Sequence, residues 1–310
     1  MTRYREICAD LAERIGSGEF AAGAALPAVR ELAAEWDTTT STVSRAARVL
    51  AEAGVIVLAD RRRAHVARDG ALAARRFLHG DLVLRLAGSD DPALDLVLRH
   101  LGHRVVTFAA GGSSAGLMAV RQGRADAAAT HLLHLDGGYN APFARGLLRG
   151  LHPHLLHLWR REQGLLVAPG NPLGLGDVVD LTRVRVAKRA HGTGTRVLLD
   201  RLLRDAGADP DSVQGPEVGS HLEVALAVAT GVVDTGVGVR AAAGDLGLSF
   251  VPLTWEDYDI VLGAAALDAA AALIATLRRD DVRAEVAGLG GYDPADSGTV
   301  TDLEPLPCPV

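Results

Sequence analysis

Two short loops in the chain combine glycines with hydroxyl side chains, and each stands where a helix would begin. They are GGSS at 111–114 and GTGTR at 192–196. Backbone N–H groups at a helix start bind anions, and Arg196 adds a charged donor. Each loop alone also fits an ordinary helix cap, but two of them in one fold favour a clamp on a tetrahedral oxyanion or a carboxylate. The candidate ligand-binding residues are Ser89, Ser113, Ser114, His131, Thr193, Gly194, Thr195 and Arg196.

Other reactive side chains form no complete catalytic or metal-binding pattern. His131 and His134 have the His-x-x-His spacing, but no third and fourth ligand is evident, so we expect no metal. Asp90 and Asp91 could serve acid–base chemistry, although their place before a helix favours capping. No P-loop or Gly-x-Ser-x-Gly motif is present, and no Ser-His-Asp set stands out. We therefore expect no cofactor and no enzymatic activity.

Residues 26–66 carry a second pattern of functional interest, which predicts a helix, a turn, a second helix and a two-stranded β-ribbon. The first helix is expected at 28–35, and Thr39, Thr40 or Ser41 would cap the second. The ribbon strands are expected at 55–58 and 64–66, with three arginines at the tip. These elements are typical of a DNA-binding domain.

On the second of these helices, Val43, Ala47 and Leu50 repeat at helical spacing and should face the core. Hydroxyls and arginines then face outward, where they can reach phosphates and base edges in a major groove. The arginines of the ribbon tip suit phosphates or a minor groove. The candidate DNA-binding residues are Arg30, Thr40, Ser41, Thr42, Ser44, Arg45, Arg61, Arg62 and Arg63.

Composition sets broad limits on the protein. A chain of 310 residues with 48% hydrophobic content can form two or three domains with sizeable cores. The net charge of −6 argues against a protein whose whole surface binds nucleic acid. Residues 38–68 nevertheless hold six arginines against two acidic residues, which gives a local charge of +4. Cys8 and Cys308 lie at opposite ends, and no signal peptide or membrane-spanning run is evident. We expect a soluble, cytoplasmic protein without a disulfide and without membrane contact.

From residue 82 onward, strand, polar loop and helix repeat, which is the rhythm of a parallel sheet. The rhythm shifts around 155–168, where we expect two strands, at 155–159 and 164–167, separated by a charged quartet. Two more strands are expected at 250–253 and 260–262, a helix near 175–181, and coil from Gly288. Residues 69–81 would link the two regions, as a helix or as coil.

The N-terminal motifs LPAVRELA and TSTVSRAARVLAEAGVI, followed by a basic hairpin, resemble the winged helix-turn-helix of GntR-type transcription regulators. The resemblance covers about residues 1–68. Ser44 stands where many members have arginine, and the wing has three arginines in place of its usual Gly-x-Gly. The resemblance therefore implies groove contacts more directly for Arg30 and Thr42 than for the wing tip.

The C-terminal motifs GSDDPALDLV, REQGLLVAPGNP and GVVDTGVGVRAAA resemble the periplasmic-binding-protein-like domain that follows DNA-binding domains in some bacterial regulators. Molybdate- and tungstate-binding proteins have a similar fold. The resemblance implies a two-lobed domain over 82–310, with its second lobe at about 163–250. Arg240 occupies a position where an acidic residue is common, which would favour an anion if it faces the cleft.

Together these features predict an α/β fold: a winged helix-turn-helix at 1–68 and a two-lobed, type II domain with mostly parallel sheets. The leading hypothesis is a ligand-responsive bacterial transcription regulator, a homodimer on a double-stranded operator. Its effector would be an oxyanion such as molybdate or tungstate, or a small carboxylate, and ligand would relieve repression. The alternatives are an enzyme acting on a phosphorylated or pterin-like substrate, and an intracellular oxyanion-binding module.

Overall fold

The computed structural model describes residues 3–58, 63–80, 83–108, 111–244 and 246–303. The chain divides into two compact units, one of residues 1–83 with 102–106 and one of residues 84–101 with 107–310. Within the described residues, no helix is long and apolar enough to cross a lipid bilayer. The predicted Arg61, Arg62 and Cys308 lie outside the described residues.

The first unit is a small helical domain with a β-ribbon. Its elements are α1 (Arg3–Gly16), α2 (Val29–Glu35), α3 (Thr40–Glu52), β1 (Ile56–Val57), β2 (His65–Val66) and α4 (Gly70–His79). The apolar faces of α1, α2 and α3 meet in one core that also takes in Val55, Val66 and Ala74. The predicted helix, turn, helix and ribbon are therefore confirmed, and Thr39 caps α3 by accepting a hydrogen bond from the backbone of Thr42.

One detail of α3 differs from the expectation. Ala46 is fully buried together with Val43 and Leu50, whereas Ala47 is only partly buried. Of the two forms expected for residues 69–81, helix or coil, the structure has the helix α4. This helix packs on the same core: Ala74 is fully buried, and Arg75 donates to the carbonyl of Gly16 at the end of α1.

The larger sheet of the protein has the strand order β4-β3-β5-β10-β6-β9-β7-β8. The pairs β3–β5, β7–β9 and β7–β8 are parallel, whereas β10 and β6 are antiparallel to each other and to their neighbours β5 and β9. The strands are β3 (Leu84–Gly88), β4 (Val105–Thr107), β5 (Ala127–Thr130), β6 (Pro153–Val167), β7 (Val186–Arg189), β8 (Glu217–Val218), β9 (Thr235–Val239), β10 (Ser249–Gly263), β11 (Tyr292–Asp293) and β12 (Val300–Asp302).

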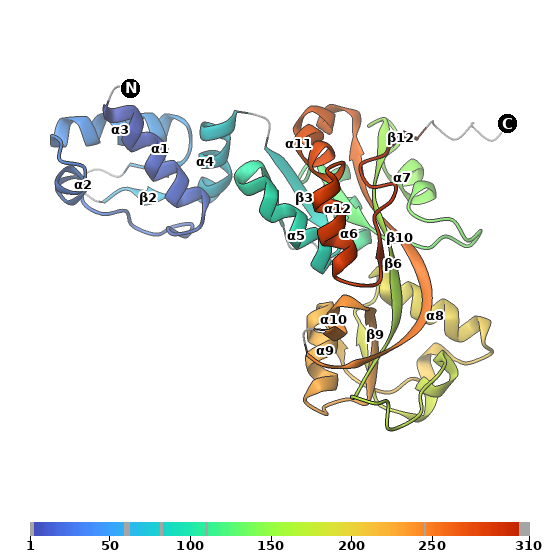
Figure 1. The fold of residues 1–310 in the computed structure, drawn as a ribbon. Coiled ribbons are helices and arrows are strands. Elements are labelled where there is room, and N and C mark those ends of the chain that lie inside the picture. The colour runs from blue at the N-terminus through green and yellow to red at the C-terminus, as the bar shows by residue number, and fades with distance from the viewer. Residues whose placement is uncertain (1–2, 59–62, 81–82, 109–110, 245, 304–310) are drawn as a thin grey trace. The chain divides into compact units, whose positions relative to one another are not determined.

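Helices cover this sheet in two groups (Figure 1). The α-helices are α5 (Pro92–Leu101), α6 (Ser113–Arg121), α7 (Ala141–Leu147), α8 (Gly194–Asp205), α9 (His221–Ala229), α10 (Ala241–Gly244), α11 (Leu267–Leu277) and α12 (Asp280–Gly288). Short 3₁₀ helices are η1 (Gly102–Arg104), η2 (Val178–Arg183), η3 (Pro210–Ser212) and η4 (Ala264–Ala266). The helix expected near 175–181 is therefore a 3₁₀ turn, and the expected coil after Gly288 contains β11 and β12, which pair with β6.

The long strands β6 and β10 join two lobes (Figure 1). At one end β10 pairs with β5 in the first lobe, and at the other end β6 pairs with β9 in the second lobe. Each lobe has its own apolar core, around Leu117 and Val261 in the first and around Leu165 and Val237 in the second. The predicted two-lobed α/β fold is confirmed, but each expected pair of short strands is one continuous strand of 15 residues.

One close contact in the first lobe sets a limit on side-chain size. The α6 helix approaches β3 so closely that a Cβ added to Gly116 would lie 2.5 Å from the Cα of Gly88. Real Cβ atoms do not tolerate such an approach, so the helix or the strand would have to shift. A glycine is therefore required here for packing.

We predict that Gly116→Ala lowers the free energy of unfolding by about 1–3 kcal/mol, because the added methyl group overpacks this contact. Chemical denaturation followed by tryptophan fluorescence in a Trp36→Phe background, which leaves Trp159 and Trp255 as the reporters, measures the effect in the second unit. Gly146→Ala in α7 is the matched control, since Gly146 is exposed and nothing lies within 4 Å of its would-be Cβ. Equal stability of the two variants would contradict the packing argument.

Candidate functional site

The middle of the β6–β10 pair, residues 159–163 and 255–258, has two unlike faces because successive side chains of a strand alternate. Arg160 and Asp257 form a half-exposed ion pair on one face, and Arg240 pairs with Glu162 at 2.6 Å. The other face is buried and includes Arg161 and Glu256, which lie opposite each other in the register. We call this stretch the hinge ribbon.

The buried face of the hinge ribbon is a charged cluster. Arg161 has no exposed surface and donates to Asp91 at 2.6 Å and to Glu256 at 2.8 Å. Its guanidinium also lies 4.1 Å from the ring centre of Tyr258. The remaining contacts of the cluster come from Gln163, which donates to Glu256 at 2.6 Å, and from Tyr292, which donates to Asp91 at 3.1 Å. We call these residues, with His131, the hinge cluster.

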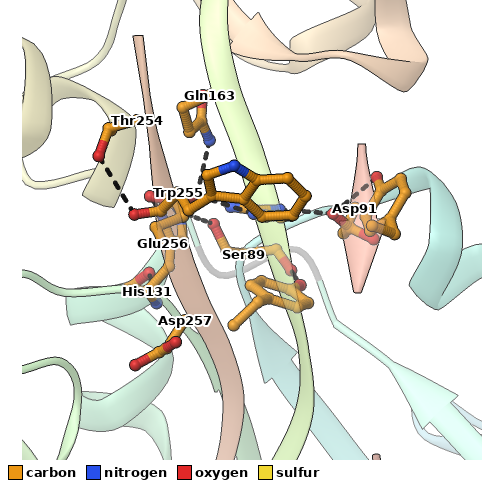
Figure 2. Close-up of polar contacts among 12 residues, drawn as sticks. Ser89, Asp91, His131, Gln163, Thr254, Trp255, Glu256 and Asp257 are labelled. Atoms are coloured by element: carbon orange, nitrogen blue, oxygen red, sulfur yellow. Dashed lines mark hydrogen bonds and ion pairs between the residues drawn. The ribbon is translucent and has the colours of Figure 1, made fainter. Parts of the chain in front are cut away.

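Figure 2 shows Glu256 between Gln163 and His131. In this view Asp91 lies on the other side of the green strand, β6. The Nδ1 of His131 lies 3.1 Å from Glu256, and its Nε2 lies 2.9 Å from the hydroxyl of Ser89. Because a carboxylate only accepts, Nδ1 donates to Glu256, and the neutral ring accepts from Ser89 at Nε2. Ser89 and His131, both predicted ligand residues, are thus already hydrogen-bonded to each other.

Burial shifts the titration of these groups. Desolvation lowers the pKa of His131, and Arg161 adds to that effect, while Glu256 opposes it. Desolvation alone would raise the pKa of Glu256, but His131 and Arg161 outweigh it and lower the pKa to about 2. Burial raises the pKa of Asp91, although Arg161 opposes this. Arg161 therefore serves mainly to balance carboxylates inside the hinge cluster.

Between the lobes, a second set of polar groups is only partly satisfied. Arg189, the last residue of β7, is 4% exposed and donates through Nη2 to Asp90 of the other lobe at 2.9 Å. Its Nε and Nη1 have no hydrogen-bond partner among the described residues. His221, the first residue of α9, is 2% exposed, and both of its ring nitrogens also lack a partner. Buried donors without partners are costly, so these atoms mark a place for a ligand or water.

The two glycine-rich loops do meet across the lobes. A Cβ added to Gly112 would lie 3.0 Å from the Cγ2 of Thr193, and one added to Gly194 would clash with His131. The hydroxyl of Thr193 caps α8, and that of Ser113 accepts from the backbone of His131. The structure thus brings the starts of α6 and α8 together, but with their side chains engaged in local bonds. Among the other predicted ligand residues, Thr195 is buried and Ser114 is partly buried.

Arg196 occupies a different environment from the one expected. Its guanidinium pairs with Asp200 at 2.8 Å and lies 3.4 Å from Glu217, so its charge is already balanced. Arg189 has two unpartnered nitrogens between the lobes, and Nη2 of Arg161 in the hinge cluster also lacks a partner among the described residues. Sequence reasoning missed both arginines, together with His221 and Glu256. The position of Arg189 directly at the end of a parallel strand was the available signal, since ligands bind at that edge. Arg240, also considered for the cleft, pairs with Glu162 and lies over Phe250.

Most of the described residues that are candidates for DNA binding lie on α3 and at the start of α2. Thr40, Ser41, Ser44 and Arg45 are exposed on α3, and Arg30 is exposed on α2. Thr42 is partly buried, and its hydroxyl shares a hydrogen bond of 2.9 Å with that of Thr39. The guanidinium of Arg45 lies 4.2 Å from the ring centre of Tyr4 in α1, which limits the orientations of this side chain. Arg63 is 55% exposed and forms an ion pair with Glu31 at 3.3 Å.

Comparison with known proteins identifies both units. The family model of the PBP superfamily domain matches residues 95–278, more than half of the chain. The chain belongs to the PBP superfamily. The model of bacterial regulatory proteins of the gntR family matches residues 3–66 of this PBP-superfamily protein. A GntR DNA-binding region fused to a PBP-like effector domain is the architecture of a ligand-responsive transcription regulator.

Relatives of this PBP-superfamily protein include the uncharacterized protein YvgK of Bacillus subtilis (strain 168), with 32% identity over 223 residues, 69% of this chain and 72% of YvgK. A protein encoded in the 5′ region of a 2Fe–2S ferredoxin gene of Clostridium pasteurianum is 34% identical over 113 residues, 34% of this chain and all of that protein. Among solved structures, an H₂O₂-bound mutant of Corynebacterium glutamicum OxyR matches 91% of this chain and 94% of its own, with a TM-score of 0.52 and 13% identity. That likeness concerns the fold alone.

We predict that Arg161→Met lowers the free energy of unfolding by about 3–5 kcal/mol, because it leaves Asp91 and Glu256 buried without their cation. Denaturation of the full chain measures the effect. Arg279→Gln is the control, since the Arg279–Asp281 pair is exposed and its loss should leave stability unchanged. A mild effect of Arg161→Met would mean that the carboxylates are protonated in the folded protein.

The two buried histidines predict a pH dependence. Desolvation, reinforced by Arg189, lowers the pKa of His221 well below its ordinary 6.5, and the pKa of His131 is lowered as well. The unfolded chain therefore binds protons below pH 6.5 that the folded chain does not, so stability is full above pH 6.5 and falls as the pH drops below it. Each group contributes at most about 1.4 kcal/mol per pH unit.

His221→Asn should reduce this slope between pH 6.5 and 5, as measured by denaturation at a series of pH values. Its ring nitrogens have no partner to lose, so the substitution should be tolerated. His152→Asn at an exposed position is the control and should leave the slope unchanged. A slope that is unaffected by His221→Asn would show that His221 is protonated in the folded protein.

Proposed function

We propose that this protein is a transcription regulator whose operator affinity is controlled by a small anionic effector bound between the two lobes. The observation that carries the effector site is Arg189, a buried guanidinium with two unpartnered nitrogen positions between the lobes. The carboxylate of Asp90 accepts from Arg189 and from the backbone nitrogen of His221, the first residue of α9. The starts of α6 and α8 also meet across the lobes. Helix starts and a guanidinium attract the same kind of group, an oxyanion or a carboxylate.

Exposed hydroxyls and arginines on α3 support operator recognition by this helix. Ser41, Ser44, Arg45 and Arg48 are all exposed, and a helix with such a face can enter a major groove. Arg45 is the side chain best suited to base contact, because its packing on Tyr4 limits its orientation before binding. We further propose that two copies bind a pseudo-palindromic operator, as paired recognition helices require.

Effector control of DNA binding follows from the two-lobed architecture. A ligand between the lobes stabilises their closed arrangement, and any difference in operator affinity between arrangements couples the two sites reciprocally. Release of repression on binding is the direction that we propose. The effector class includes molybdate, tungstate and small carboxylates.

For DNA recognition, we predict that Arg45→Ala weakens binding to the DNA upstream of the protein's own gene about fivefold to 150-fold, since a good arginine–base pair contributes about 1–3 kcal/mol. Gel-shift titration and footprinting at two salt concentrations measure the loss. Arg279→Ala is the charge-matched control, because Arg279 is an exposed arginine of the second unit. Unchanged affinity of Arg45→Ala at low salt would exclude α3 as the recognition helix.

For the effector, we predict that Arg189→Gln abolishes ligand-induced thermal stabilisation, whereas Arg196→Gln retains it. The physical reason is that Arg189 has free donors, while Arg196 is already paired with two carboxylates. A thermal-shift screen with molybdate, tungstate, sulfate, phosphate and small carboxylates provides the measurement. The opposite outcome, loss in Arg196→Gln alone, would restore Arg196 as the anion clamp.

A further inference from the structure

One face of α4 remains largely outside the core of the first unit. Ala74 is fully buried in that core, and Arg75 donates to the carbonyl of Gly16 at the end of α1. The other face presents residues that lie three, four, seven and eight positions apart, which is the spacing of neighbours along one side of a helix. We call these residues the α4 stripe: Asp69, which directly precedes the helix, Leu72, Ala73, Arg76 and Phe77.

The charges of the α4 stripe have no partner within the described part of the chain. Asp69 and Arg76 are both exposed. The carboxylate of Asp69 accepts no capping hydrogen bond from α4, and neither Asp69 nor Arg76 forms an ion pair among the described residues. Phe77 is 37% exposed although its ring is apolar. The stripe therefore carries one free charge of each sign and an aromatic ring that is only partly covered.

The surface of the α4 stripe is hollow. A cavity of about 360 Å³ is lined by the stripe and by Ala53, the residue that follows α3. Because Ala53 and Ala73 have only methyl side chains, they leave room between Leu72 and Phe77. An apolar side chain from outside fits this space, and the burial of apolar surface favours its entry. The hollow therefore suits a group of the size of leucine that arrives together with complementary charges.

A second copy of α4 supplies such a group. Two copies can lie antiparallel about a two-fold axis that passes between Leu72 and Ala73. Leu72 of each copy then faces Ala73 of the other and enters its hollow, since every contact about a two-fold axis occurs twice. In the same arrangement Asp69 of each copy faces Arg76 of the other, so both charges gain a partner of opposite sign. The stripe is therefore complementary to itself in shape and in charge.

The antiparallel arrangement also gives Phe77 a partner. Counted outward from the two-fold axis, Phe77 of each copy lies opposite Arg68 of the other. Arg68 is exposed and forms no ion pair among the described residues, so its guanidinium is able to lie over the ring. This contact is a third complementary pair, and it arises from the register that the charges require.

We propose that the α4 stripe is a dimer interface, in which α4 of a second copy of this chain lies antiparallel on α4 of the first. This inference rests on the proposed function, in which two copies bind one operator. The 10 residues of α4 make a helix about 15 Å long, so the contact is smaller than a standard protein interface, and charge rather than area decides the pairing. Because α4 shares its core with α3, the pairing also fixes the spacing of the two α3 helices.

A cysteine next to the two-fold axis tests the arrangement in the full chain without DNA. Leu72→Cys, in a Cys308→Ser background, brings two engineered thiols together, while the native Cys8 is buried. We expect a disulfide-linked dimer on mild oxidation, seen as a doubled mass on a non-reducing gel. Ala71→Cys is the matched control, because Ala71 is exposed on another side of α4. It should cross-link about tenfold more slowly, since a disulfide requires Cα atoms within about 7 Å of each other.

Charge reversal tests the register of the two helices. Asp69→Arg and Arg76→Asp each turn both ion pairs into like-charge pairs, so either variant alone should dimerise about tenfold more weakly. The double variant restores both pairs in reversed order and should dimerise like the parent. A mixture of the two single variants should form heterodimers in preference to either homodimer, because every pair is then of opposite sign. Sedimentation of tagged copies measures these populations, and high salt should reduce the preference.

Arg279→Asp and Asp281→Arg are the matched controls, since both residues are exposed and lie at the start of another helix, α12. Their mixture should pair at random. Circular dichroism and melting temperature establish that each variant is folded.

The inference is overturned if Leu72→Cys cross-links no faster than Ala71→Cys, if the two single charge variants pair at random, or if the double variant fails to restore the dimer. Operator binding by a protein with any of these results would leave the proposed function standing without this interface. Dimerisation through the α4 stripe without operator binding would remove the proposed function and leave the interface.

Discussion

The burial of Arg161 between two carboxylates is the interaction on which the second unit depends. Asp91 comes from the loop after β3, Arg161 from β6 and Glu256 from β10, so one guanidinium joins three segments far apart in the chain. Removing these ions from water is expensive, and only the complete set of partners offsets the cost. Tyr258, Tyr292 and Gln163 add further contacts, although Nη2 of Arg161 and Oε1 of Gln163 have no partner among the described residues. These contacts hold the hinge ribbon at the point where both lobes join it.

Around this fixed centre, the faces of the lobes are held together by contacts of a different kind. Gly112 and Gly194 lie at helix starts that approach Thr193 and His131 of the opposite lobe, and neither position has room for a larger side chain. The Arg189–Asp90 pair crosses the same gap with only part of its hydrogen-bonding capacity used. Small residues thus allow a close approach, while the incompletely satisfied charges remain available to a ligand. In the function that we propose, a ligand that binds here changes how firmly the lobes are joined.

The DNA-binding unit shows how a short sequence pattern can serve stability and recognition at once. Val43, Ala46 and Leu50 anchor α3 in the core, which leaves its hydroxyls and arginines exposed on the other side. Thr39 caps the helix, and Tyr4 of α1 supports Arg45. The same unit also contains α4, whose Ala74 enters the common core. The folding of α4 is therefore coupled to that of the DNA-binding elements.

The sequence by itself determined what depends on local periodicity: the helix-turn-helix, the ribbon, the alternation of strands and helices, and the placement of glycine-rich loops at helix starts. These features follow from neighbours three, four or two residues apart, which any single chain displays. The tertiary structure decided which charges are free. Arg196 and Arg189 look alike in sequence, yet Asp200 and Glu217 balance the first, while the second keeps unpartnered donors between the lobes. Likewise, the charged quartet at 160–163 resembles a break between strands in the sequence, because the partners of its charges are distant in the chain. Arg161 pairs with Asp91 and Glu256, which lie 70 and 95 residues away, Arg160 pairs with Asp257, and Glu162 pairs with Arg240.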